Sequence, residues 1–160
     1  MKSLSINLNF LGSNRGITLV EIMVVIGAVV IISAASIPVF SNFYVSSQLD
    51  ENSIQIVRTL RTARDRSVAG VNGSPHGIKL QSDRYILYQG PSFALRNTVY
   101  DRSMVLDNAM ALTWNLSGPD EINFSKGIGK PDNTGTITLT HSIKGNRTIL
   151  INSYGLAEEQ

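Results

Sequence analysis

The sequence predicts an α+β protein in which one long N-terminal helix packs on a C-terminal, antiparallel, β-rich head. Residues 17–37 are almost wholly apolar, and residues 39–69 contain neither Pro nor Gly. Residues 70–75 then form a Gly-, Asn- and Pro-rich turn signal, after which apolar and polar residues tend to alternate. Helical spacing followed by alternating spacing indicates a helix that leads into strands.

The bulk composition fits one folded domain with an attached segment. The chain has 160 residues, of which 42% are hydrophobic and 16% charged, which is too apolar for a disordered chain. Cys is absent, so thiol catalysis, disulfides and Cys-based zinc sites are excluded. Without Lys2 and Arg15, which precede the apolar block, the basic residues fall from 14 to 12 and equal the 12 acidic ones. Global charge therefore argues neither for nor against a nucleic-acid partner.

The apolar block has the length of a membrane-spanning helix. A helix needs about 20 largely apolar residues to cross a bilayer, and residues 17–37 supply them with Glu21 as their only ionisable side chain. The basic residues before the block predict that the head lies outside the cytoplasm. A carboxylate within such a helix costs on the order of 2.5–3.5 kcal/mol, so Glu21 needs a partner.

Beyond Pro38 the sequence predicts an amphipathic continuation of the helix. Proline removes a backbone donor and clashes with the preceding turn, which predicts a kink or local melting at Pro38. Residues 17–69 would extend about 80 Å if unbroken. Charged residues (Arg58, Arg61 and Asp65) occupy one side of the second half. The other side carries an apolar stripe, made of Leu49, Ile56, Val57, Leu60 and Ala63.

In the head, alternating apolar residues predict several short strands. Ile78/Leu80 and Tyr85/Leu87 predict a hairpin around residues 81–83. Residues 136–143 and 147–152 predict a second hairpin, with Ile137, Leu139 and Ile143 on one face and Ile149 and Ile151 on a face of the partner strand. His141 shares the first of these faces, which favours a hydrogen-bonded core histidine. Residues 111–116 and 122–125 are further strand candidates, and residues 92–107 are expected to form a loop with a short strand.

The N-terminal segment Arg15-Gly16-Ile17-Thr18-Leu19-Val20-Glu21 resembles the type IV prepilin cleavage motif. The resemblance implies that a prepilin peptidase cuts after Gly16. Ile17 would then be the new N-terminus and the site of N-methylation, standing where the family usually has Phe, and Glu21 would be the fifth mature residue. Pro38 matches a proline common in pilin helices. The implied fold is pilin-like.

The same resemblance gives Glu21 its partner. A new ammonium at Ile17 would lie about one helical turn from the carboxylate of Glu21. In an assembling bundle, Glu21 of one subunit would neutralise Ile17 of its neighbour inside an apolar core. A subunit at the wrong axial offset would leave both charges unpaired, so the pair would set the register of assembly.

The rest of the chain resembles the type II secretion pseudopilin H/FimT family of minor pilins. The similar segments are the Arg/Ala-rich helix end at residues 60–69 and the hairpin segments at residues 135–139 and 147–155. The resemblance implies a minor pilin or pseudopilin, not an enzyme, that initiates, caps or joins a type IV pilus or a type II secretion pseudopilus. Its implied partners are the prepilin peptidase, other pilin or pseudopilin subunits, the inner-membrane assembly platform and membrane lipid.

These expectations divide the chain into four parts and place it in the cell. Residues 1–16 would be the prepilin leader, residues 17–38 the transmembrane and assembly helix, residues 39–69 the amphipathic helix and residues 70–160 the globular head. The precursor would sit in the bacterial cytoplasmic (inner) membrane as a single-pass protein. The processed subunit would then enter a periplasmic or extracellular filament.

Two other functions remain open. Some FimT-like proteins bind DNA for uptake, and the candidate residues here are Arg58, Arg61, Arg64 and Arg66, or Arg147 with Lys144. Asp65 among these arginines and Glu158-Glu159 near the end of the sequence argue against phosphate binding, so nucleic acid is not the favoured partner. The other alternative is a signal-anchored binding or enzymatic domain.

No motif of a metal site, a cofactor site or a catalytic centre is found. His76 and His141 are the only histidines and lie in unrelated segments. No pair of histidines has helical metal-binding spacing, and no G-x-S-x-G motif is present. We therefore expect no catalytic residue, no metal and no cofactor.

Overall fold

The computed structural model describes residues 16–160, and the side chains of all of these except residues 35–42. Apart from Gly16, the predicted leader lies outside the described residues. The chain divides into two compact units, Met1–Ser41 and Asn42–Gln160. They are described separately below.

Helix α1 runs from Leu19 to Val68 and so contributes to both units. Its backbone is helical through Pro38, so the local melting predicted there is not seen. The fixed φ of proline, near −65°, is itself compatible with a helix. The side chain of Pro38 lies outside the described ones.

The predicted membrane-spanning half of the helix is contradicted. Among the described residues, none of the helices combines the length and the apolar character that crossing a bilayer requires. The predicted fold class is wrong in this respect, and so is the predicted single-pass location in the inner membrane.

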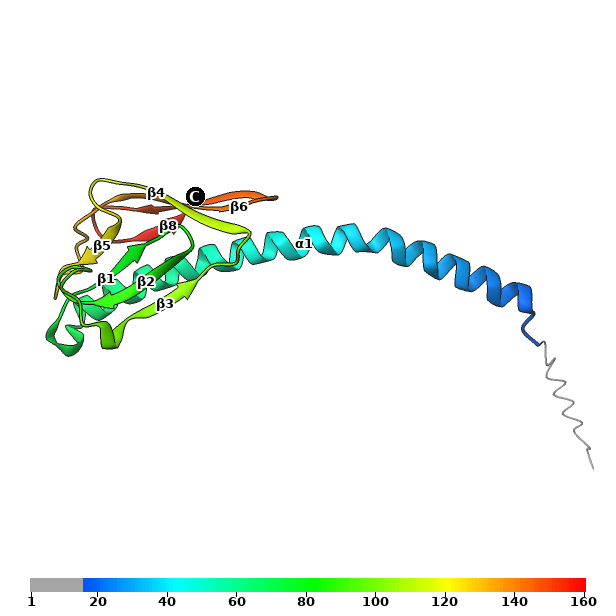
Figure 1. Ribbon diagram of the computed structural model, residues 1–160, viewed down its shortest axis with the longest axis horizontal. Coiled ribbons are helices and arrows are strands. Elements are labelled where there is room, and N and C mark those ends of the chain that lie inside the picture. The colour runs from blue at the N-terminus through cyan, green and yellow to red at the C-terminus, as the bar shows by residue number, and fades with distance from the viewer. Residues whose placement is uncertain (1–15) are drawn as a thin grey trace, which may run out of the picture. The chain divides into compact units, whose positions relative to one another are not determined.

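The second unit contains two four-stranded antiparallel sheets in addition to the second part of α1 (Figure 1). The first sheet has the order β3-β2-β1-β5, with β1 at His76–Leu80, β2 at Arg84–Gln89, β3 at Arg102–Val105 and β5 at Glu121–Phe124. The second has the order β4-β6-β7-β8, with β4 at Met110–Leu116, β6 at Gly135–His141, β7 at Gly145–Ile151 and β8 at Ala157–Glu159. Two short 3₁₀ helices complete the unit, η1 at Val71–Gly73 and η2 at Thr98–Tyr100.

One hydrophobic core joins α1 to both sheets. The predicted apolar stripe of the helix is buried in full, with Ile56 and Ala63 at 0% exposure. The sheets contribute the other large side chains of this cluster, among them Ile78, Leu80, Tyr85, Ile122 and Phe124 from the first and Leu112, Ile137, Leu139, Ile149 and Ile151 from the second. A head this small has little interior of its own, so the helix completes the core.

Both predicted hairpins are confirmed. Ile78 pairs with Leu87 in the β1–β2 hairpin, and Ile137 pairs with Ile149 in the β6–β7 hairpin. His141 is buried, and its Nδ1 accepts a hydrogen bond from the backbone N–H of Ile143 at 3.1 Å. The predicted burial of Ile143 is wrong, because β6 ends at His141 and Ile143 lies in the following turn, 77% exposed.

The outer face of the first sheet has a second, smaller packing site around Tyr88. This side chain is fully buried, and its hydroxyl accepts from Asn123 Nδ2 at 3.1 Å and donates to Glu121 Oε2 at 3.3 Å. Burial raises the pKa of the Tyr88 phenol, which keeps the hydroxyl protonated. The ring lies directly over Gly77 of β1: a Cβ there would approach Tyr88 Oη to 2.5 Å and the carbonyl oxygen of Ile122 to 2.7 Å.

We therefore expect Gly77→Ala to destabilise the head by about 1–3 kcal/mol, the range for overpacking a well-packed site. The clash with Ile122 involves a backbone atom, so a rotamer change alone cannot relieve it. Thermal unfolding followed by near-UV circular dichroism measures the loss. Gly27→Ala is the matched control, because its added Cβ meets nothing within 4 Å; equal melting temperatures for the two variants would contradict the packing described.

Candidate functional site

The segment around the predicted cut site forms the start of α1. Gly16, Ile17 and Thr18 precede the helix, which begins at Leu19. The Thr18 side chain accepts a hydrogen bond from the backbone N–H of Glu21 at 3.2 Å, and its carbonyl accepts from Ile22 at 3.2 Å. Thr18 is thus the N-cap, and Glu21 lies in the first turn, where the helix dipole favours a carboxylate.

The sequence carried a signal for this cap that the sequence analysis missed. Thr18-Leu19-Val20-Glu21 has the Thr-x-x-Glu spacing of a capping box and comes directly before an apolar run. The same residues that form the cleavage-motif resemblance therefore have a local structural role. Thr18 and Glu21 fix where the helix starts, two residues after Ile17.

The first part of α1 exposes apolar side chains on all of its sides. Exposed residues occur at nearly every position from Ile17 to Ile32, with Leu19 at 74% and Ile31 at 71% exposure. Successive helical residues differ by about 100° in direction, so a run without gaps leaves no polar side. Single exposed apolar residues are ordinary, but a contiguous apolar surface indicates an interaction site. Glu21 is the one acidic or basic residue among residues 17–34.

The arginines considered for DNA binding are distributed around the second part of α1. Arg58 is exposed, next to a groove lined by Asp50 and Glu51. Arg61 donates through Nη2 to the carbonyl oxygen of Ala157 at 3.1 Å. Arg64 and Arg66 are two positions apart, hence about 200° apart around the helix.

Arg64 and Arg66 accordingly have different neighbours. A Cβ added at Gly155 would lie 3.1 Å from Arg64 Nε, which shows how closely the guanidinium stem passes this loop. Arg66 instead lines a cavity beside β2 and β3. The structure does not bring Arg64 and Arg66 together, whereas phosphate binding needs several charges that converge.

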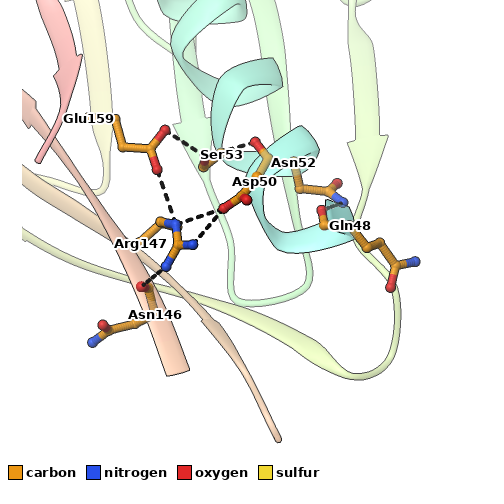
Figure 2. A network of polar contacts seen from close by, with 7 residues as sticks. All are labelled: Gln48, Asp50, Asn52, Ser53, Asn146, Arg147 and Glu159. Carbon is orange, nitrogen blue, oxygen red and sulfur yellow. Dashed lines mark hydrogen bonds and ion pairs between the residues drawn. The ribbon is translucent and has the colours of Figure 1, made fainter. Parts of the chain in front are cut away.

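Arg147, the other arginine considered, belongs to an ion-pair network that joins α1 to the second sheet (Figure 2). Its Nη2 lies 2.6 Å from Asp50 Oδ1 of the helix, and its Nε lies 3.3 Å from Glu159 Oε1 of β8. The buried Ser53 donates to the other oxygen of Glu159, Oε2, at 2.9 Å. Two carboxylates therefore neutralise Arg147, and Glu159 links β8 to the helix.

His76, at the start of β1, is buried, as His141 is. Only 3% of it is exposed, and its backbone N–H donates to Ser67 Oγ at 2.8 Å. Burial lowers the pKa of the imidazole, and the nearby charge of Arg66 lowers it further, while a hydrogen bond that the imidazole donates to the Ser74 backbone raises it. Within the described part of the chain, no three His, Asp or Glu side chains are grouped so that they could hold a metal ion.

Comparisons of this chain with protein-family models, with curated proteins and with solved structures found no match. The functional argument therefore depends on the residues described above.

The network of Figure 2 predicts a modest, salt-sensitive contribution to stability. Arg147 and Asp50 are 35% and 48% exposed in their side chains, and exposed pairs contribute roughly 0.2–1 kcal/mol each. We expect Arg147→Gln to lower the free energy of unfolding by about 1 kcal/mol in urea denaturation at low salt, and by less at 1 M salt.

A double-mutant cycle with Asp50→Asn isolates the pair and should give a coupling energy of about 0.5 kcal/mol. Arg58→Gln, which removes the same charge from the exposed side of α1, serves as the control and should change stability little. Equal losses for Arg147→Gln and Arg58→Gln would show that the network does not stabilise the head.

The buried imidazole of His76 is expected to lower the free energy of unfolding of the head on acidification. Its folded-state pKa lies below the ordinary value of 6.5, so the unfolded chain binds the proton more readily and stability falls as pH drops through 6.5 toward the folded pKa. We expect His76→Gln to flatten the pH dependence of the free energy of unfolding between pH 7.5 and 5.5. Arg66→Gln should flatten it in part, because Arg66 is the second cause of the shift. Unchanged slopes in both variants would contradict this role.

Proposed function

We propose that the chain is a subunit of a type IV pilin-like filament, a minor pilin or pseudopilin that initiates, caps or joins the assembly. In this proposal a prepilin peptidase cuts between Gly16 and Ile17, and the first part of α1 becomes the assembly element. The observation that carries the proposal is the contiguous exposed apolar surface of residues 17–32 with Glu21 at its start.

A surface of this kind requires a covering partner. Burying one large aliphatic side chain is worth about 1.5–3 kcal/mol, and more than ten such side chains are exposed between Ile17 and Ile32. A helix that is apolar on all sides is typical of an element surrounded on every side. Equivalent helices of neighbouring subunits provide such surroundings in a filament, because each helix packs against its neighbours and is surrounded by them in turn.

The position of Glu21 supports the proposed cut after Gly16. Cleavage there creates an ammonium group at Ile17, four residues before Glu21, and leaves Thr18 as the helix N-cap. A carboxylate surrounded by apolar side chains needs an opposite charge. The ammonium of a neighbouring subunit would supply one, and the charged hydrogen bond would fix the axial offset between subunits.

The second unit supports the proposal in a different way. Its core is formed entirely by residues from Leu49 onward, so the head completes its fold without residues 17–34. The apolar surface of those residues therefore stays free for other subunits. Arg58, Glu51 and Arg61 of this unit are exposed, which suits a position in water.

The test is incorporation of Glu21→Gln into filaments. The wild type and the variant are co-expressed with a prepilin peptidase and the cognate subunits, sheared filaments are collected, and the chain in them is quantified by mass spectrometry. We expect the variant to be cut to an N-terminus at Ile17, yet to enter filaments at least tenfold less, because the unpaired ammonium costs about 3 kcal/mol or more when buried.

Glu51→Gln is the matched control, since it removes the same charge from an exposed position of α1 and should leave incorporation unchanged. Recovery of wild-type chains that still begin at Met1 would contradict processing at Gly16–Ile17. Incorporation of Glu21→Gln at the wild-type level would contradict the charge-pair mechanism.

A further inference from the structure

A cavity of about 420 Å³ lies where the end of α1 meets the first sheet. It is bordered by Arg66 of α1, Asn72 of η1, His76 at the start of β1, Gln89 at the end of β2, and Asp101 and Arg102 at the start of β3. Residues that are far apart in the sequence thus surround one space. All of them belong to the second unit.

Two buried polar atoms at this cavity have no protein partner. His76 Nδ1 and Asp101 Oδ1 are inaccessible to solvent and form no hydrogen bond with any described residue. His76 is 97% buried, since only 3% of it is exposed. Buried polar atoms are almost always paired, and leaving one unpaired costs about as much as a lost hydrogen bond. His76 and Asp101 both belong to the lining of the cavity.

The charge at the cavity is positive. Arg66 and Arg102 both line it, and neither guanidinium forms an ion pair or a hydrogen bond within the described part of the chain. Asp101 is the one acidic side chain of the lining, and Arg96 Nε lies 2.7 Å from its Oδ2. Because Arg96 neutralises Asp101, the two free guanidiniums determine the charge that a ligand meets.

We propose that this cavity binds a small molecule that carries an oxyanion, either phosphate or carboxylate, held by Arg66 and Arg102. Guanidinium groups present planar arrays of donors that match both oxyanions. Arg66 is half-buried and Arg102 is exposed. The donors of both guanidiniums are therefore accessible from the open side of the cavity.

The remaining lining and the volume limit the ligand further. The lining also includes the buried Leu87 and Tyr88 and, from η2, Val99 and Tyr100, which are 83% and 48% exposed. A space of this volume suits a polyol phosphate, a hydroxy acid or an amino acid, since drug-sized ligands occupy about 300–1,000 Å³. A single nucleic-acid backbone phosphate would leave most of the space unused.

The test is calorimetric titration of the full chain, kept dispersed in a neutral detergent at low salt, with three matched probes. Glycerol 3-phosphate and glycerate share adjacent hydroxyls and differ in their oxyanion, and glycerol has the hydroxyls alone. We expect saturable binding of at least one of the two anions and none of glycerol, and the tighter of the two identifies the oxyanion.

Arg66→Gln and Arg102→Gln should each weaken that binding about tenfold or more, the effect of losing a charged hydrogen bond. Arg58→Gln, also an arginine of α1 but outside this cavity, should bind as the wild type does. Binding of neither anion, or equal binding by Arg66→Gln and the wild type, overturns the proposal. Displacement of the bound anion by a short DNA duplex, lost in Arg66→Gln, also overturns it by assigning the site to nucleic acid.

Discussion

The packing of one side of α1 against both sheets is the contact on which the rest of the head depends. The helix places Ile56 and Leu60 in the core together with small residues, Ser53, Ala63 and Ser67, that are fully buried and let the strands approach closely. Ser67 shows how the polar members of this side are satisfied. Its hydroxyl donates to the carbonyl of Ala63 and accepts from the N–H of His76, so the last turn of the helix also holds the first residue of β1.

The features that the sequence predicted correctly are those that depend on neighbours along the chain. The recurrence of apolar residues at positions 49, 56 and 63 identifies the buried side of a helix, because side chains seven residues apart point in nearly the same direction. The alternation in the two hairpins identifies the core face of each strand for the same local reason. Ile143 was misplaced because alternation alone does not show where a strand ends. At residues 17–37, counting apolar residues predicted a membrane span, which the described helix contradicts.

The features that the sequence did not predict arise from contacts between distant segments. No local pattern separates the strands into two sheets, and β8 is a three-residue strand held beside β7, too short for a periodicity to be visible. The pairing of Arg147 with Asp50 and Glu159 likewise depends on how the folded chain brings α1 and the second sheet together. The arginines of α1 differ from these cases, because the 100° step of a helix already predicts that Arg64 and Arg66 face apart.

The molecule leaves two surfaces incomplete, and they differ in what would complete them. The first part of α1 presents apolar side chains that a large, non-polar surface would cover, whereas the cavity of the second unit presents two guanidiniums that an anion would neutralise. Apolar burial is non-directional and tolerates any partner of sufficient area, so in the proposed filament Glu21 would select one axial offset. Hydrogen bonds at the cavity are directional and select a ligand by themselves. In the functions proposed above, assembly would depend on residues 17–34 and ligand recognition on the head, so the two could be separated.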